Sequence, residues 1–192
     1  MKFVLISLLA LLSFSVEAQR TDIDLKQSKI EWTGKKLGGE HYGNIQLSSG
    51  HLTFNKNKLV GGTFEMDMAS ITCVDITDDK SNKRLVDHLK SEDFFSVTRF
   101  PKSSFIITRV EYKSATEYLV TGDLTIKDKA NPITFTAKIN AMSTQTIAEA
   151  ILVFDRSKYD VKFGSQSFFE NLGDKLVYDD VDMTVKLVLL TK

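Results

Sequence analysis

The sequence predicts an all-β protein, an eight-stranded antiparallel barrel with one helical insert at about residues 79–95. Three observations support this prediction. Apolar and polar side chains alternate along most of the chain, as expected for strands with one wet face and one apolar face. Turn residues separate the alternating segments. A single segment combines an apolar stripe at helical spacing with charged residues around its remaining surface.

Eight segments show the alternation of a strand, and they are residues 29–33, 44–54, 59–71, 103–112, 118–127, 132–142, 146–154 and 181–189. In the second segment Ile45 and Leu47 share one face, but Leu52 and Phe54 have the opposite parity, which predicts a bulge or bend at Ser49–Gly50. Short connections favour antiparallel neighbours, and eight such strands can close into a barrel without exposed edges. A two-sheet sandwich fits the same alternation and is the alternative.

The helical insert carries Leu85 and Leu89 one turn apart, with Val86 beside them. This spacing gives a narrow apolar stripe that can lie against the barrel. Ser91 can cap a further short turn after the main helix. Pro101 then fixes the local backbone, so the next strand is expected soon after it.

Residues 1–18 have the pattern of a secretory signal peptide. Lys2 supplies a positive start, Phe3–Val16 is an apolar stretch, and Val16-Glu17-Ala18 is a small-x-small cleavage site. The apolar stretch is short for a membrane span, which needs about 20 residues. We therefore expect cleavage before Gln19, one mature domain over residues 19–192, a location outside the cytoplasm, and no stable membrane insertion after cleavage.

Composition narrows the classes of partner. The chain has 25 basic and 25 acidic residues, and this balance argues against nucleic acid, which favours a strongly basic surface. Cys73 is the only cysteine, so the chain can form no internal disulfide. Its apolar neighbours predict a small buried side chain rather than a reactive thiol.

No motif for catalysis or metal binding is present. The three histidines, His41, His51 and His88, do not have the spacing of a local zinc site, and no nucleophile elbow occurs. We expect no enzyme, no catalytic residues, no metal and no cofactor, and we expect His88 to hold the helix against the barrel through a hydrogen bond. A metal-dependent enzyme built from His41, Asp75 and His88 is kept as an alternative.

The glycine-rich segment 34–39 contains two lysines but lacks the Gly-Lys-Ser/Thr ending of a phosphate-binding loop. One interpretation is a flexible connection between strands. The other is that Lys35 and Lys36 lie at the mouth of a pocket and attract an anionic head group.

Aromatic side chains point to a dry interior. The chain has 13 phenylalanines, which carry no polar group. Ordinary core packing accounts for any single one of them. Together with the adaptable methionines they also fit the wall of a pocket, and the candidates for that wall are Phe94, Phe95, Phe100, Phe105, Phe168, Phe169, Met66, Met68, Met142 and Met183.

Several short motifs, taken in order, resemble the YceI-like family of secreted or periplasmic polyisoprenoid-binding proteins of bacteria. They are Trp32-Thr33-Gly34-Lys35, Gly39-x-His41-x-Gly43, Gly61-Gly62-Thr63-Phe64-x-Met66-Asp67-Met68, Leu85-x-x-His88-Leu89-Lys90-Ser91-x-Asp93-Phe94-Phe95, Phe100-Pro101-x-x-x-Phe105, the run from Val120 to Lys127, Pro132-x-x-Phe135 and Asp155-Arg156-Ser157. Each motif is weak alone, but their order and spacing are specific. Residues 155–175 show no strand alternation and are expected to form an irregular excursion before the last strand.

The resemblance implies a lipocalin-like eight-stranded barrel with a helix at one side, an apolar tunnel for an isoprenoid tail, and no catalytic machinery. The expected partner is an isoprenoid or quinone-like lipid, which the protein would bind, transport or store outside the cytoplasm. A homodimer is one option for the oligomeric state. A second alternative function is a stress or surface-interaction protein whose barrel is fully packed.

Parity and the resemblance together give the candidate ligand-binding residues. They share the more apolar face of their strands or belong to the helical insert, and they are Ile45, Leu47, Phe64, Met66, Met68, Phe95, Phe105, Phe135, Ile139, Met183 and Val185.

Overall fold

The computed structural model describes residues 18–142 and 144–190. The predicted signal peptide lies, apart from Ala18, outside the described residues. In chain order the elements are β1 (Gln19–Asp22), β2 (Lys29–Lys36), β3 (Gly39–Asn55), β4 (Lys58–Asp67), η1 (Met68–Ser70), α1 (Asp79–Lys90), β5 (Lys102–Tyr112), β6 (Glu117–Ile126), β7 (Lys129–Ala141), β8 (Thr146–Asp155), η2 (Arg156–Tyr159), η3 (Gly173–Lys175) and β9 (Val177–Leu189).

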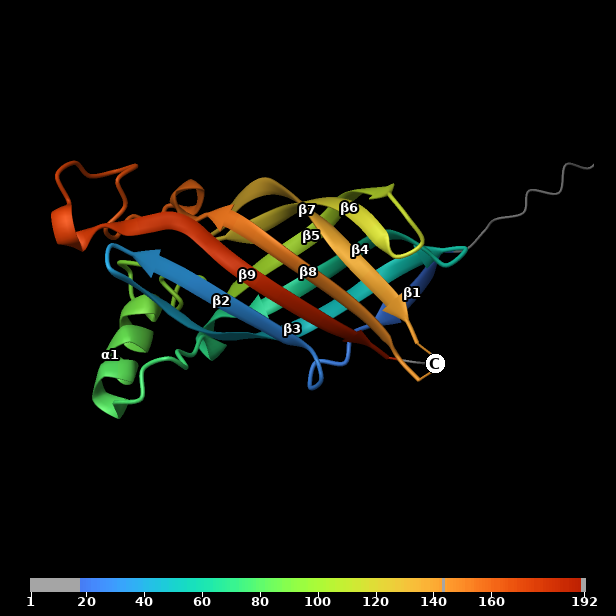
Figure 1. Cartoon of the computed structure of the whole chain (residues 1–192), viewed down its shortest axis with the longest axis horizontal. Coiled ribbons are helices and arrows are strands. Elements are labelled where there is room, and N and C mark those ends of the chain that lie inside the picture. Colours follow the sequence, from blue (N-terminus) through green and yellow to red (C-terminus); the bar gives the residue numbers. More distant parts are fainter. Residues whose placement is uncertain (1–17, 143, 191–192) are drawn as a thin grey trace, which may run out of the picture.

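Strands β2 to β9 form a closed antiparallel barrel (Figure 1). Starting from β3, the order is β3, β2, β9, β8, β7, β6, β5 and β4, and β4 pairs again with β3. The predicted eight-stranded barrel is confirmed, and the sandwich alternative is wrong. The 17 residues of β3 extend for about 55 Å along the strand, which makes the barrel long.

One strand was not predicted. β1 pairs with the second half of β3, from Gln19 opposite Phe54 to Asp22 opposite His51, while β2 pairs with the first half. The two strands therefore share one edge of β3. The sequence pattern did not indicate this strand, because β1 has only four residues, most of them exposed, and no apolar alternation.

Two predicted boundaries differ in the segment that leads to the helix. The strand expected over 59–71 ends at Asp67, whose side chain accepts a hydrogen bond from the backbone N–H of Ala69 and starts a short 3₁₀ helix. The predicted bulge is confirmed, although the register shift lies between Leu47 and Ser49, slightly before the predicted site.

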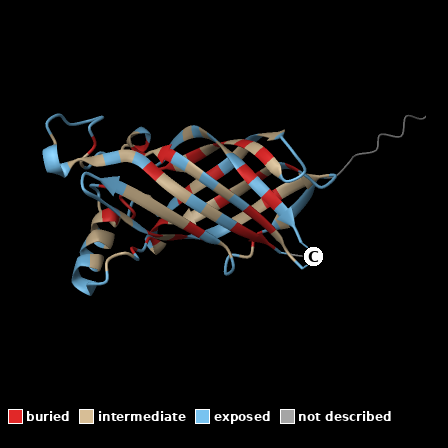
Figure 2. Ribbon diagram, in the orientation of Figure 1, coloured by how far each residue is buried: buried red, intermediate tan, exposed pale blue. Residues whose placement is uncertain are grey.

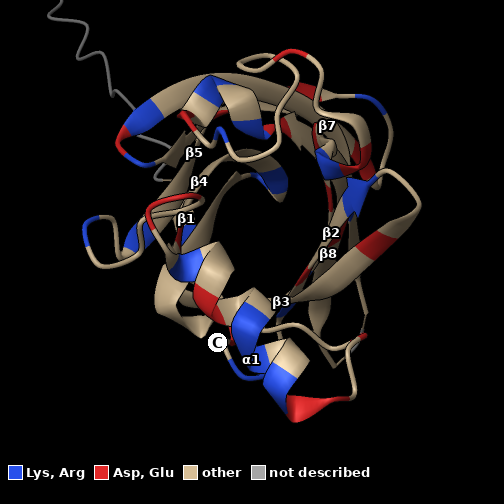
Figure 3. Ribbon diagram, turned by 90° about the vertical axis from the view of Figure 1, so that its left-hand side faces the viewer, with Lys and Arg blue, Asp and Glu red and all other residues tan. Residues whose placement is uncertain are grey.

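The helical insert is shorter than predicted. Asp78 caps the start of α1 by accepting a hydrogen bond from the N–H of Ser81, and the helix ends at Lys90. The Ser91 hydroxyl donates to the carbonyl of His88 at 2.8 Å, and residues 91–95 form turns instead of helix. The helix lies beside the rim at one end of the barrel (Figures 1 and 3).

Alternation sorts the side chains between interior and solvent, as Figure 2 shows along the strands. It is complete in β6, where Tyr118, Val120, Leu124 and Ile126 are all buried. Gly122 continues the inward row without a side chain. A Cβ added there would lie 2.4 Å from Cζ of Phe105 and 2.5 Å from the carbonyl oxygen of Ile106. The glycine therefore makes room for the phenylalanine ring.

Gly122→Ala should lower the free energy of unfolding by about 1–3 kcal/mol, because the new methyl group forces the Phe105 ring or the adjacent backbone to move. Urea unfolding followed by circular dichroism measures this change. Gly61→Ala is the matched control, since its Cβ would meet Thr53 at an ordinary 3.9 Å. Equal stability of the two variants would contradict the packing argument.

Candidate functional site

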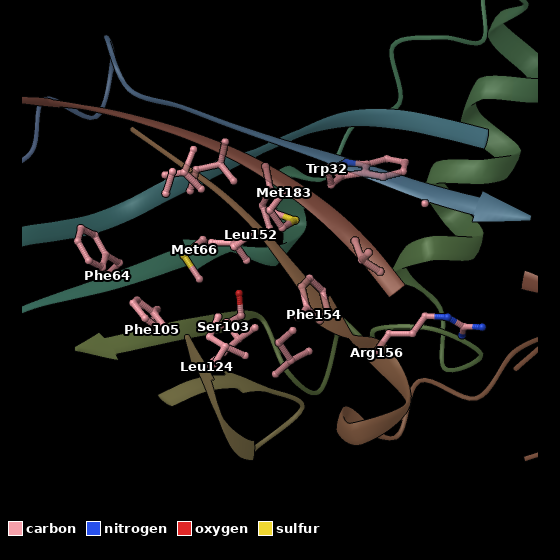
Figure 4. A pocket seen from close by; sticks show the side chains of 18 of the residues that line it. Trp32, Phe64, Met66, Ser103, Phe105, Leu124, Leu152, Phe154, Arg156 and Met183 are labelled. Carbon is pink, nitrogen blue, oxygen red and sulfur yellow. The ribbon is translucent and has the colours of Figure 1, made fainter. Parts of the chain in front are cut away.

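The barrel encloses a cavity of about 370 Å³ whose lining comes from all eight strands of the barrel and from α1. This volume lies within the range of pockets that hold small-molecule ligands. Figure 4 shows side chains from different strands, such as Met66, Phe105 and Met183, directed toward the same space. The presence of a cavity argues against the fully packed barrel considered as an alternative.

All eleven predicted ligand-binding residues line this cavity, and they are Ile45, Leu47, Phe64, Met66, Met68, Phe95, Phe105, Phe135, Ile139, Met183 and Val185. Strand parity placed most of them correctly because the inward face of a barrel strand repeats every second residue. Their contact with a ligand remains a prediction.

The middle of the cavity has an aromatic wall. The rings of Phe64 and Phe105 are stacked with centroids 6.4 Å apart, and Phe135 lies 5.5 Å from Phe105. Met66 and Met183 complete this region, and their flexible thioethers can adapt to an irregular apolar shape.

Four of the aromatic and methionine candidates do not belong to the wall. Phe168, Phe169 and Met142 are 41%, 50% and 49% exposed, and none of them, nor Phe100, lines the cavity. Phe168 and Phe169 belong to the excursion between η2 and η3, away from any strand. Met142 follows the end of β7, where parity no longer fixes the direction of a side chain.

The two ends of the cavity differ in chemistry. At the α1 end, which faces the viewer in Figure 3, polar lining residues gather, among them Lys35, Lys36, His41, His88 and Arg156. At the opposite end the side chains of Leu52, Leu59 and Tyr118 are at most 4% exposed and fill the barrel. The cavity therefore has a polar mouth beside α1 and an apolar far end.

The segment 34–39 forms a tight hairpin at this mouth rather than a flexible connection. β2 ends at Lys36, β3 begins at Gly39, and Gly38 takes the positive φ of 82° that such a turn requires. Lys35 is paired with Asp182 of β9 at 2.5 Å. The structure thus places Lys35 and Lys36 at a pocket mouth, as one of the two interpretations predicted.

Arg156 anchors the excursion that sequence reasoning left unassigned. It is 2% exposed and donates hydrogen bonds to the carbonyls of Val161, Val177 and Tyr178 at 2.9–3.1 Å. The carboxylate of Asp179 lies 3.3 Å away. Burial lowers the pKa of Arg156, and Asp179 opposes that effect. Because its partners lie beyond an irregular loop, no local pattern in the sequence identified this anchor.

The arginine ties the ends of two strands together beside the cavity. Val161 is itself fully buried, and Phe163 of the same loop reaches the cavity lining, where its ring lies 4.5 Å from that of His88. Trp32 and Phe154 are further lining residues that the candidate set missed. Both lie on predicted strands, so the alternation that selected the other candidates could have found them.

The histidines do not form a metal centre. His41 is paired with Asp75 at 2.8 Å, but His88 bonds to Asp93 at 3.1 Å. Among residues 18–142 and 144–190, no group of three or more His, Cys, Asp or Glu side chains could hold a metal ion. The predicted hydrogen bond from His88 to the barrel is wrong, because its partner Asp93 belongs to the turn that follows α1.

Asp75 is the acceptor that holds the connection between η1 and α1 against β3. Besides His41, it accepts hydrogen bonds from the backbone N–H of Tyr42 at 2.9 Å and from the thiol of Cys73 at 3.2 Å. Partial burial raises the pKa of Asp75, but these hydrogen bonds outweigh it and lower the pKa from 3.8 to about 2. Cys73 is buried, as predicted.

Arg156→Met should lower the free energy of unfolding by about 3–5 kcal/mol, because it leaves Asp179 and three carbonyls without their buried donor. Thermal or urea unfolding measures the loss. Arg109→Met is the control, since the side chain of Arg109 is 71% exposed and its pairing with Glu111 stabilises little. Similar losses in both variants would exclude the anchoring role of Arg156.

Asp75 should make stability depend on acidity between about pH 4 and pH 2. Its folded pKa lies below its unfolded value, so it contributes about 2 kcal/mol above pH 4, and that contribution disappears as the pH falls toward 2. Chemical unfolding across this range should show a steeper loss in the natural protein than in Asp75→Asn. Parallel curves would refute this role, and the comparison removes the effect of the other carboxylates.

Solved structures share this architecture. BcnA of Burkholderia cenocepacia superimposes with a TM-score of 0.71 at 24% identity, covering 87% of this chain and 99% of that one. A polyisoprenoid binding domain from Saccharophagus degradans gives a TM-score of 0.64 at 10% identity, covering 90% and 98%. At these identities the likeness establishes the fold.

Sequence relatives point to one family. A UPF0312 protein of Shewanella denitrificans is 30% identical over 142 residues, 71% of this chain and 72% of its own length. Protein YceI of Shigella flexneri is 30% identical over 98 residues, and that match spans about half of either chain. The family model of the YceI-like domain matches residues 22–189. This chain therefore belongs to the YceI-like family.

Proposed function

We propose that this protein binds an isoprenoid-type amphiphilic lipid, with the apolar tail inside the barrel and the polar head at the mouth beside α1. The observation that carries this proposal is the apolar cavity, which is lined by all eight strands and has Lys35, Lys36 and Arg156 at the end beside α1. The family membership supports it, since a structural neighbour with the same fold is a polyisoprenoid binding domain.

The energetics favour a ligand with a long tail. Each buried methylene contributes about 0.8 kcal/mol, whereas association costs on the order of 4–15 kcal/mol. A ligand that buries about ten carbons therefore roughly breaks even, and useful affinity needs a longer chain. This argument favours a polyprenyl chain, a quinone with its tail or a fatty-acyl lipid over a small metabolite.

The mouth suits a polar or anionic head group. Lys36 is exposed and borders the cavity, while Lys35 already has a partner in Asp182. Lys36 is therefore the better candidate to attract a negative charge. A quinone-like head group is the second option for the same position.

Binding is favoured over catalysis. His41 and His88 are each committed to a separate carboxylate, and the described residues offer no metal-binding cluster. The pattern of residues 1–18 supports secretion to the periplasm or beyond. In the part of the chain that the structure describes, no helix is long and apolar enough to cross a membrane.

The proposal is tested by native mass spectrometry of the mature protein, followed by solvent extraction and identification of any bound lipid. We expect a discrete added mass that extracts as a prenyl or quinone lipid. A mass without ligand that persists after incubation with polyprenyl lipids would overturn the proposal.

Phe135→Asp should abolish the added mass, because it places a charge against Phe105 in the apolar wall. Asn140→Asp is the matched control, since it adds the same charge to the exposed outer face of the same strand. Circular dichroism establishes that both variants fold. Undiminished lipid in a folded Phe135→Asp protein would exclude this position from the site.

A further inference from the structure

The wall of the barrel is divided between β7 and β8. Their ladder joins only residues 137–141 to residues 146–150. Beyond the pair Ala137–Ala150, residues 129–136 of β7 pair with β6 alone, and residues 151–155 of β8 pair with β9 alone. We call the space between these two unpaired edges the side slot.

The side slot is bounded at both ends. At one end the ladder begins again at Ala137. At the other end η2 lies beside the start of β7, where the amide of Asn131 donates to the carbonyl of Lys158 at 3.2 Å. Lys127, just before β7, donates to the carbonyl of Asp160 at 2.7 Å. The slot is therefore a bounded interruption of the backbone ladder and not a frayed strand end.

The cavity lies directly behind the side slot. Ile133 and Phe135 of β7 and Leu152 of β8 line the cavity and are partly buried, as are several lining residues elsewhere in the barrel. Glu149, an exposed residue beside the last ladder pair, also borders the cavity. The cavity lining therefore includes both edges of the slot, and at Glu149 it includes a residue of the outer surface.

The middle of the slot's rim is uncharged, between Lys129 and Asp155 at the η2 end and Glu149 at the ladder end. There the outward side chains are Pro132, Thr134 and Thr136 on β7 and Ile151 and Val153 on β8. Ile151 is 75% exposed, more than any other large apolar side chain of the described residues, and Val153 is 50% exposed. Two apolar side chains therefore face solvent beside the interrupted ladder, with the apolar cavity on its inner side.

A second interruption in the wall shows what a filled gap looks like. The β4–β5 ladder joins only residues 63–67 to residues 102–106. There Leu59 is 4% exposed, and a Cβ on Gly62 would already lie 3.2 Å from Ile107. The outer rim on β5 carries the ion pair of Arg109 with Glu111. That gap is filled on its inner side, although Val60 and Tyr112 on its rim are 48% and 51% exposed, so it differs from the side slot in its inner packing and not in the exposure of its rim.

We propose that the tail of the bound lipid enters and leaves the barrel sideways, through the side slot, from a lipid bilayer against which Ile151 and Val153 rest. This inference depends on the proposed lipid-binding function. A lipid tail that enters through the side passes directly from the apolar interior of the bilayer to the apolar cavity of the barrel. A tail threaded from the polar mouth would pass Lys35, Lys36 and Arg156 with its apolar end first.

The test is to staple the side slot. Thr134→Cys with Val153→Cys places one thiol on each rim, in a Cys73→Ser background, and a short bifunctional thiol reagent joins them. The readout is the rate at which polyprenol moves from phosphatidylcholine–phosphatidylglycerol vesicles to the protein. We expect the staple to slow transfer at least tenfold relative to the same protein before stapling.

The matched control is Lys138→Cys with Glu117→Cys, which staples an outward-facing pair that the β6–β7 ladder already holds opposite each other, away from the cavity lining. This staple should leave the transfer rate unchanged. Equal rates for the slot protein before and after stapling would overturn the proposal and leave the mouth as the route. Absence of polyprenol binding in every protein, stapled or not, would instead refute lipid binding itself.

A second variant covers the case in which the stapled protein does not fold. Ile151→Glu places a charge on the most exposed rim position without altering the cavity lining. It should slow transfer from vesicles severalfold while the amount of polyprenol bound at equilibrium stays the same. An unchanged transfer rate would count against contact between the rim and the bilayer.

Discussion

The pairing of β3 with β4 is the constraint on which the structure depends, because it closes the barrel. Each half of β3 is covered on one edge by a different strand, β2 and then β1, while its other edge joins β4. In a closed barrel, the alternation along each strand directs every second side chain into the interior and the others to the outer surface. The same closure gives all eight barrel strands a share in the cavity.

The cavity lies where inward side chains would otherwise meet at the barrel axis. Gly122 yields space to Phe105, and the rings of Phe105 and Phe135 form a wall rather than a plug. The cavity of about 370 Å³ is thus bounded by packed side chains and not filled by them.

The sequence predicted the barrel and its inward residues well because both depend on a local period of two. Phe135 and Ile139, for example, needed only their parity on one strand. Boundaries that depend on capping were less accurate, since Ser91 ends the helix through a hydrogen bond to His88 that periodicity does not reveal. Arg156 stands in one of the family motifs, but its anchoring role was not predicted, because its partners are backbone carbonyls around an irregular excursion, whose positions no side-chain pattern encodes.

The side slot was beyond prediction for a related reason, because the alternation of β7 runs unbroken through its paired and unpaired halves. η2 lies at one end of this interruption. Arg156 binds η2 to the start of β9, and the carbonyl of Lys158 accepts a hydrogen bond from Asn131 at the start of β7. The turn that the buried arginine anchors therefore borders both the polar mouth of the cavity and the side slot. The mouth and the slot thus lie next to each other at the α1 end of the barrel.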